Sequence, residues 1–158
     1  MRVAISGKGG VGKTTISAVL ARTLGRRGHR VIAIDCDSDP NLAANVGLGE
    51  EMAGMLRERG VAAVAVKLGD AGAFVDAAGW HGRVPAYAVE VVDTTGAGDA
   101  FCGGFLAAVL AGWEMERATR FANAVGALCV TAVGGTAGVR SREETLRFME
   151  SGAIRSRA

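Results

Sequence analysis

Residues 91–101 read VVDTTGAGDAF, and within them Gly96, Ala97 and Gly98 leave an almost bare backbone just before Asp99. The apolar residues that follow Asp99 recur at helical spacing, so a helix is predicted to begin there. Backbone N–H groups at the start of a helix point outward and favour a bound anion. This stretch therefore predicts a phosphate cradle.

A second glycine-rich stretch, GKGGVGKTT, occupies residues 7–15 and has the P-loop pattern. It follows the apolar run RVAIS and precedes an amphipathic helical pattern, which is the context that a P-loop requires. Its N–H groups would face phosphates, Lys13 would reach the outer phosphates, and Thr14 could ligate Mg²⁺. A glycine-rich turn that only joins a strand to a helix is the alternative. The predicted nucleotide contacts here are Gly7, Lys8, Gly9, Gly10, Val11, Gly12, Lys13, Thr14 and Thr15.

Bulk composition narrows the class of protein. A length of 158 residues fits a single domain, and two complete nucleotide-binding domains would not fit. The net charge of +2 without a basic and aromatic cluster argues against nucleic acid as a partner. Three scattered cysteines favour neither a disulfide framework nor a zinc site, and no apolar run is long enough for a signal peptide or a membrane span. We expect a cytoplasmic protein without a membrane partner.

Apolar periodicity predicts an alternation of strands and helices. Strands are expected at 2–6, 30–35, 61–69, 72–75 and 87–92, with a polar loop between the last two. Helices are expected from the P-loop to Gly28, around 41–46, at 50–60, after Asp99, around 121–128, and after a capping box of Ser141 and Glu144; the tail 152–158 should fray. The expected fold is α/β with three layers, a mostly parallel sheet and helices on both faces, in one domain over residues 1–158.

The N-terminal part resembles a known family. KGGVGKTT at 8–15, followed by VIAIDCDSDPNL at 31–42, is similar to the deviant Walker A P-loop ATPases, which include MinD, ParA, nitrogenase iron protein and the nickel-insertion ATPases of carbon monoxide dehydrogenase. The resemblance implies a homodimer in which Lys8 reaches the partner's nucleotide, Asp37 orients the attacking water, and Asp35 lies near Mg²⁺. A solvated turn is the alternative for these aspartates.

The remainder resembles the C-terminal part of PfkB-type, ribokinase-like carbohydrate kinases. The matching motifs are VKLGDAGAFV at 66–75, DTTGAGDAFCGGF at 93–105 and FANAVGALCVTAVGGTAG at 121–138. The resemblance implies that Asp99 is the general base and that Asn123 lies by adenine; a capping aspartate and a satisfied buried amide are the alternatives. It also implies phosphate contacts from Lys67, Gly69, Gly72, Gly96, Ala97 and Gly98, and a monovalent cation such as K⁺ beside Asp93 and Thr95.

The two resemblances meet at a join near residues 47–51, between a P-loop strand-helix-strand unit (1–49) and a PfkB-like, Rossmann-like nucleotide-binding segment (50–158). The leading hypothesis is an ATP-binding kinase that transfers phosphate to a sugar hydroxyl, with Asp99, Lys13 and Asp37 as the catalytic candidates. A dimeric P-loop ATPase is one alternative, and a recombined or engineered chimera that binds nucleotide without turnover is the other. The sequence identifies no sugar pocket.

Overall fold

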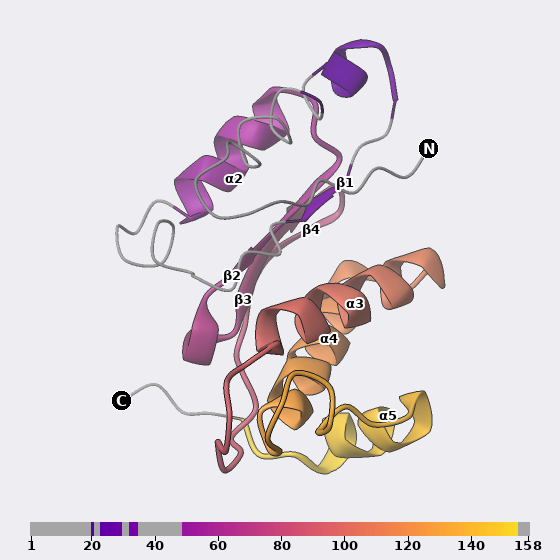
Figure 1. The fold of residues 1–158 in the computed structure, drawn as a ribbon. Helices are drawn as coiled ribbons and strands as arrows, with labels where there is room; N and C mark the ends of the chain where they lie inside the picture. Colours follow the sequence, from indigo (N-terminus) through magenta and orange to yellow (C-terminus); the bar gives the residue numbers. More distant parts are fainter. Residues whose placement is uncertain (1–19, 21–22, 30–31, 35–48, 155–158) are drawn as a thin grey trace.

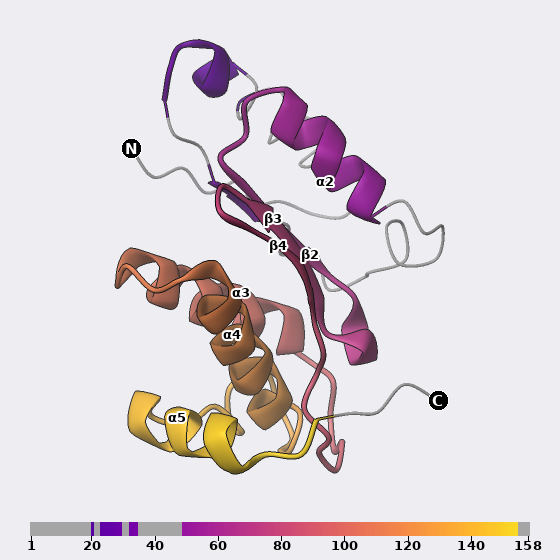
Figure 2. The ribbon, with the colours of Figure 1, turned by 180° about the vertical axis from the view of Figure 1, so that it is seen from behind.

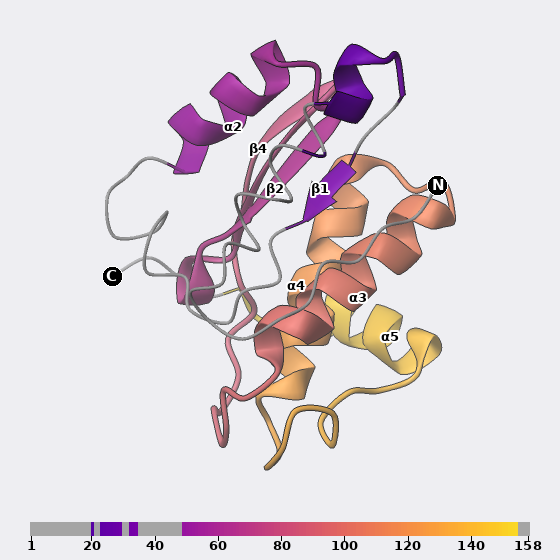
Figure 3. The same ribbon diagram turned by 45° about the horizontal axis from the view of Figure 1, so that its top comes forward.

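A computed structural model describes residues 20, 23–29, 32–34 and 49–154. Its sheet has the order β1-β2-β3-β4. These strands span Ile32–Ile34, Ala63–Lys67, Ala73–Ala77 and Trp80–Val84. β1, which Figure 3 labels beside β2, pairs with β2 in parallel, whereas β2 with β3 and β3 with β4 are antiparallel.

Helices cover both faces of this sheet. α2 (Gly49–Glu58) lies on one face, and α3 (Ala97–Leu110) and α4 (Met115–Cys129) lie on the other (Figures 1 and 2). α5 (Arg142–Ser151) packs on α4, and the short 3-10 turn η1 (Gly69–Ala71) joins β2 to β3. The predicted α/β class with three layers is therefore confirmed.

The described sheet is mixed, which corrects the expectation of a mostly parallel one. The stretch expected to be a polar loop contains β4, because the tight turn at Ala78 and Gly79 returns the chain to pair Trp80 with Ala77. Gly79 has a φ of 88°, which glycine adopts at little cost in such a turn. The sequence predicts a loop here because His81, Gly82 and Arg83 give β4 little apolar content.

The strand expected at 87–92 is also wrong. Only an isolated bridge between Tyr87 and Ile154 forms there, and further along the N–H groups of Val92 and Asp93 donate to the carbonyl oxygen of Val130. The same bridge, with a bond from the N–H of Ala88 to the oxygen of Ala153, shows that the tail does not fray before Ile154. The backbone of this connection is thus fixed by the tail and by the end of α4 rather than by the sheet.

Side chains alternate across the sheet and build two cores. On the α3–α4 face, small strand residues meet large helix residues; the members are Ala63, Ala65, Ala73, Val75, Ala77, Phe101, Cys102, Phe105, Ala108, Ala118, Phe121, Ala122 and Val125. On the α2 face the buried members are Ala53, Val61, Val64 and Phe74. Small residues on strands let α3 and α4 approach the sheet closely, as close packing requires.

Other predicted elements are confirmed where the structure describes them. Helical backbone at Thr23 to Arg26 ends before Gly28, whose φ is 80°, and α2, α3, α4 and α5 fall where helices were expected. The capping box of Ser141 and Glu144 opens α5. The expected strand at 2–6 and helix at 41–46 lie outside the described residues. Within the described part of the chain, no helix has the length and apolar character needed to cross a membrane.

Candidate active site

The predicted cradle at residues 93–99 is a tight loop that leads directly into α3. Gly96 caps the helix in the left-handed conformation, with φ 76° and ψ −2°. The N–H of Ala97 donates to the carbonyl oxygen of Thr94 (3.3 Å), and the N–H of Ala100 donates to that of Gly96 (2.8 Å). Gly98 and Asp99 occupy the first turn, where N–H groups have no acceptor within the helix. This geometry suits an anion.

Gly96 is fixed by a close backbone neighbour. A Cβ atom at this position would lie 2.7 Å from both Cα and the carbonyl oxygen of Gly135, in the turn that follows α4. Neither contact is with a side chain that could move aside. Both the positive φ and this approach therefore require glycine at residue 96.

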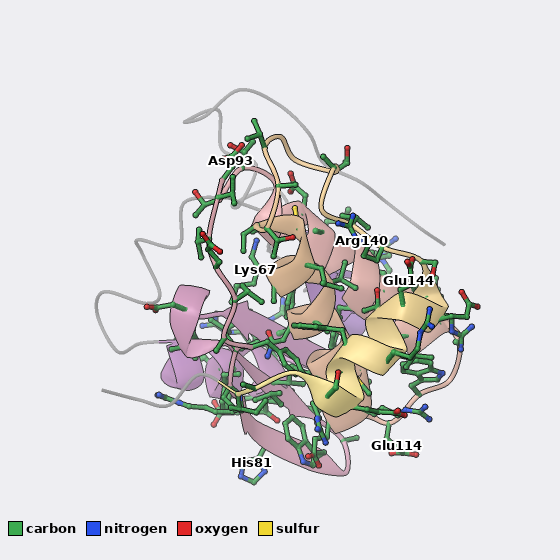
Figure 4. All side chains as sticks on the ribbon, turned by 90° about the horizontal axis from the view of Figure 1, so that it is seen from below. Lys67, His81, Asp93, Glu114, Arg140 and Glu144 are labelled. Carbon is green, nitrogen blue, oxygen red and sulfur yellow. The ribbon has the colours of Figure 1, made fainter. Side chains whose placement is uncertain are left out.

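Asp93 joins the cradle to the same turn. Its Oδ1 accepts the N–H of Thr95 (2.9 Å), and its Oδ2 accepts the N–H of Gly134 (2.8 Å). The bond from Gly134 first, and then those from Thr95, hold the pKa of Asp93 below its ordinary value. An ionised Asp93 thus links residues that lie far apart in the sequence. Figure 4 labels it on the loop that carries the cradle.

Cys129 lies at the end of α4 and was not among the predicted site residues. It is fully buried, and its Sγ lies 3.2 Å from the carbonyl oxygen of Gly135 and 3.7 Å from that of Thr95. Burial raises the pKa of the thiol, and the charges of Asp93 and Asp99 add to this effect. A cysteine on the buried stripe of a helix gives no signal of such a position in the sequence.

The segment from Lys67 to Gly72 lies at the same end of the sheet as the start of α3, in both opposite views of the fold (Figures 1 and 2). It forms η1, with positive φ at Gly69 (59°) and Gly72 (95°). A Cβ atom on Gly72 would lie 2.1 Å from the carbonyl oxygen of Val84. Gly72 therefore packs against the backbone that leaves β4, and its role in phosphate contact stays a prediction.

Asn123 is buried on α4 with 7% of its surface exposed. Its side-chain amide donates to the carbonyl oxygens of Val84 (2.9 Å) and Pro85 (3.1 Å). These two bonds occupy both of its N–H donors, which favours a structural role. Adenine binding by Asn123 stays a prediction, and any such contact would fall to its amide oxygen.

The predicted cation site offers oxygen ligands at Asp93 and Thr95. The described residues contain no group of three His, Cys, Asp or Glu side chains that could hold a metal ion. One carboxylate together with backbone carbonyls suits a weakly bound monovalent cation better than a zinc-type site. Occupation by K⁺ stays a prediction.

The P-loop and the acidic residues after it lie outside the described residues. This holds for the predicted site residues Gly7, Lys8, Gly9, Gly10, Val11, Gly12, Lys13, Thr14, Thr15, Asp35 and Asp37. Because β1 and β2 are parallel, their carboxyl ends lie at one edge of the sheet, the edge from which Lys67 leads into η1.

A hollow of about 190 Å³ lies elsewhere on the protein. Its lining comes from the end of β4, the first half of α4 and the tail, namely Arg83, Val84, Pro85, Tyr87, Glu116, Arg120 and Ile154. Cys129 and Val130, which contact the cradle, stand at the opposite end of α4. This hollow is therefore separate from the cradle.

Comparisons with known proteins match both parts of the chain. A family model described as an AAA domain matches residues 2–71, and the model of the pfkB family of carbohydrate kinases matches residues 42–142. The chain is 37% identical to ribokinase from Haemophilus influenzae over 98 residues, which cover 62% of this chain and 32% of that protein. It is 48% identical to carbon monoxide dehydrogenase accessory protein CooC from Rhodospirillum rubrum over 69 residues, which cover 37% of this chain and 26% of that protein.

Among solved structures, a ribokinase II from E. coli in complex with ATP and Mg²⁺ superposes with a TM-score of 0.63 at 36% identity, over 72% of this chain and 37% of that one. The chain thus spans about a third or less of the length of the curated relatives named above. The stretch matched by the kinase model, residues 42–142, makes up more than half of the sequence. The chain therefore belongs to the pfkB family of carbohydrate kinases.

Proposed function

We propose that the protein binds ATP in the cradle at residues 93–99 and transfers its γ-phosphoryl group to the hydroxyl of a small sugar. The observation that carries this proposal is the position of Asp99 in the first turn of α3, three residues after the left-handed Gly96 that caps the helix. In this proposal the exposed Asp99 carboxylate and the N–H groups of the same helix start would act on the same phosphoryl group. The family match supports the proposal, since it spans the whole cradle.

The proposed reaction is a single displacement at phosphorus. The sugar hydroxyl oxygen attacks the γ-phosphorus, its proton passes to the Asp99 carboxylate, and ADP leaves with the electrons of the broken P–O bond. The N–H groups of Gly96, Ala97 and Gly98 would stabilise the negative charge that builds on the transferring group. Lys67, Gly69 and Gly72 would contact the remaining phosphates from η1.

Metal ions would assist this reaction. Mg²⁺ would neutralise charge on the phosphates, and Thr14 and Asp35 would hold it only if the P-loop lies beside this cradle; a monovalent cation beside Asp93 and Thr95 would stiffen the cradle. The E. coli ribokinase II structure named above was solved with ATP and Mg²⁺, which supports the choice of ATP as phosphoryl donor and of Mg²⁺ as metal ion. The residues that would contact the sugar are not assigned.

The test is phosphoryl transfer from ATP to a panel of small sugars by the intact chain. Asp99→Asn should lower transfer at least about 100-fold, because a general base contributes on that order. Glu114→Gln, which changes an exposed acidic residue at the start of α4, is the matched control and should keep full activity. No transfer by the parent chain, or equal transfer by Asp99→Asn, would refute the proposal.

A second candidate function is a homodimeric P-loop ATPase. It is favoured by the AAA-domain match over residues 2–71 and by the 48% identity to CooC. Lys13 would hold the outer phosphates, Lys8 would reach across the dimer, and Asp37 would orient the attacking water. ATP hydrolysis should then disappear in Lys13→Ala and in Lys8→Ala but persist in Asp99→Asn, which is the reverse of the kinase pattern.

A third candidate is nucleotide binding without turnover by a chimera joined near residues 47–51. The two family models overlap only between residues 42 and 71, which brackets that join. Calorimetry with ATP would select this candidate if binding is tight while transfer and hydrolysis are both absent. Lys13→Ala and Gly96→Ala would then show which cradle holds the phosphates.

A further inference from the structure

The thiol of Cys129 stands between two pieces of backbone that are distant in sequence. Thr95 directly precedes Gly96 in the cradle, and Gly135 belongs to the turn after α4. The Sγ atom lies 3.2 Å from the oxygen of Gly135 and 3.7 Å from that of Thr95. Its single proton can go to one oxygen at a time, and the shorter distance favours Gly135.

Two other contacts bring the same two pieces together. Gly96 packs directly on Gly135, and Asp93 accepts the N–H of Gly134. The buried thiol is thus one contact of a clamp whose other contact is the part-buried bond from Gly134 to Asp93. Both contacts draw residues 134–135 onto the cradle.

The size and chemistry of a thiol suit this position. Alanine would leave both carbonyl oxygens without the thiol donor and would open a void in a fully buried place. Valine would direct a methyl group at the oxygens and would force the two pieces apart. Serine would keep a donor in nearly the same volume. The raised pKa keeps the sulfur protonated at neutral pH, which is the state that can donate.

We propose that Cys129 is a positioning residue: by holding residues 134–135 against Thr95 and Gly96, it fixes the N–H groups at the start of α3 in the geometry that binds phosphate. Its effect on nucleotide rests on the proposed function. The clamp itself can be measured without any nucleotide. The two readouts therefore separate a failure of this inference from a failure of the proposed function.

The experiment compares Cys129→Ala, Cys129→Ser and Cys129→Val in the full chain, with Cys102→Ala as the matched control. Cys102 is an equally buried cysteine on α3. Hydrogen exchange of the Gly134 amide reports the clamp, calorimetry with ATP reports the cradle, and urea unfolding corrects for general loss of stability.

In Cys129→Ala, exchange at Gly134 should speed up about fivefold beyond the control, and the Kd for ATP should rise about fivefold, as the loss of one hydrogen bond predicts. Cys129→Val should change both more, and Cys129→Ser should restore both to within about twofold. If all three variants match Cys102→Ala in both readouts, Cys129 only fills the core and the inference is overturned. If the parent chain binds no ATP while Gly134 exchange follows the expected order, the clamp stands and the proposed function fails.

Discussion

The two faces of the sheet are built with different amounts of core. On the α3–α4 face, Phe101, Phe105 and Phe121 pack on alanines of β2 and β3. On the α2 face, Phe74 is the one buried aromatic residue of the described cluster. β4 turns His81 and Arg83 toward that second side, where both are exposed. α2 therefore covers only part of its face.

This difference follows the division seen in the family matches. The cradle, Asp93 and Cys129 all belong to the well-packed side, which the kinase model matches alone beyond residue 71. α2 and β2 lie where the two matches overlap. The kinase-like part thus carries both the thicker core and the phosphate cradle, while the thinner face is covered by α2, which lies in the overlap of the two matches.

The largest expected effect is loss of an aromatic side chain from the thicker core. Phe105 is 1% exposed. Replacing it with alanine should lower the free energy of unfolding by about 4 kcal/mol, because the tightly packed neighbours cannot move in to fill the cavity. Phe74→Ala should cost about 2 kcal/mol, because the smaller cluster on the α2 side can relax into the space. Urea unfolding of both variants measures the difference. Equal losses would mean that the two faces contribute alike.

Gly69 and Gly72, at the η1 turn between β2 and β3, test how rigidly this turn packs against the backbone after β4. Gly72→Ala should cost about 3 kcal/mol, because it combines a positive φ with a clash against Val84. Gly69→Ala should cost about 1 kcal/mol, because it has a positive φ but open space around it. Thermal unfolding compares the two. A similar loss for both would show that the backbone after β4 can shift, and that the cradle side is less rigid than its contacts indicate.

Features encoded over short stretches could be predicted from the sequence. The helix after Asp99, the capping box at Ser141 and the helix end before Gly28 each depend on neighbours within one or two turns. β4 could not be predicted, because its core-facing positions are Trp80, Gly82 and Val84 and its alternation therefore contains only two large apolar residues. The ordered start of the tail could not be predicted either, because Ile154 pairs with Tyr87, which is distant in the sequence.

In the candidate site, too, local features could be predicted from the sequence and contacts between distant residues could not. The motif placed Gly96 and Asp99 at a helix start, and the structure has them there. The partners of Asp93, Asn123 and Cys129 could not be predicted, because their contacts join residues 41, 39 and 34 positions apart. No local pattern encodes such a distance, and the packing of α4 against both α3 and the sheet brings those residues together.

On the α2 face, the side chain of Arg57 makes polar contacts that link α2 to the start of β2 and to β3. It donates to the carbonyl oxygens of Val61 and Ala62, and its Nε lies 3.3 Å from Oδ1 of Asp76. The Nε atom makes no hydrogen bond among the described residues, so the contact with Asp76 is an ion pair only. Arg57→Ala should therefore cost about 2 kcal/mol, and Asp76→Asn less than about 1 kcal/mol. Urea unfolding measures both. An Asp76→Asn loss as large as that of Arg57→Ala would place the stabilisation in the ion pair instead.

The smallest expected effect is on the stability of the fold in acid. It compares Asp93, in the cradle, with Glu144, at the start of α5. Backbone N–H groups lower the pKa of Asp93 in the folded protein, so its contribution is present above the unfolded value near 3.8 and is lost as the pH falls through the folded pKa. Glu144 shifts in the same direction, through Ser141 on α5. Both carboxylates therefore steepen the loss of stability below about pH 4.

The two carboxylates can be distinguished by NMR in the folded state. The Gly134 amide resonance should titrate with a midpoint below the ordinary carboxyl range in the parent chain and in Glu144→Gln. It should lose that titration in Asp93→Asn, which cannot ionise. A Gly134 resonance that titrates unchanged in Asp93→Asn would mean that another group holds residues 134–135 against the cradle, and that the clamp does not depend on the charge of Asp93.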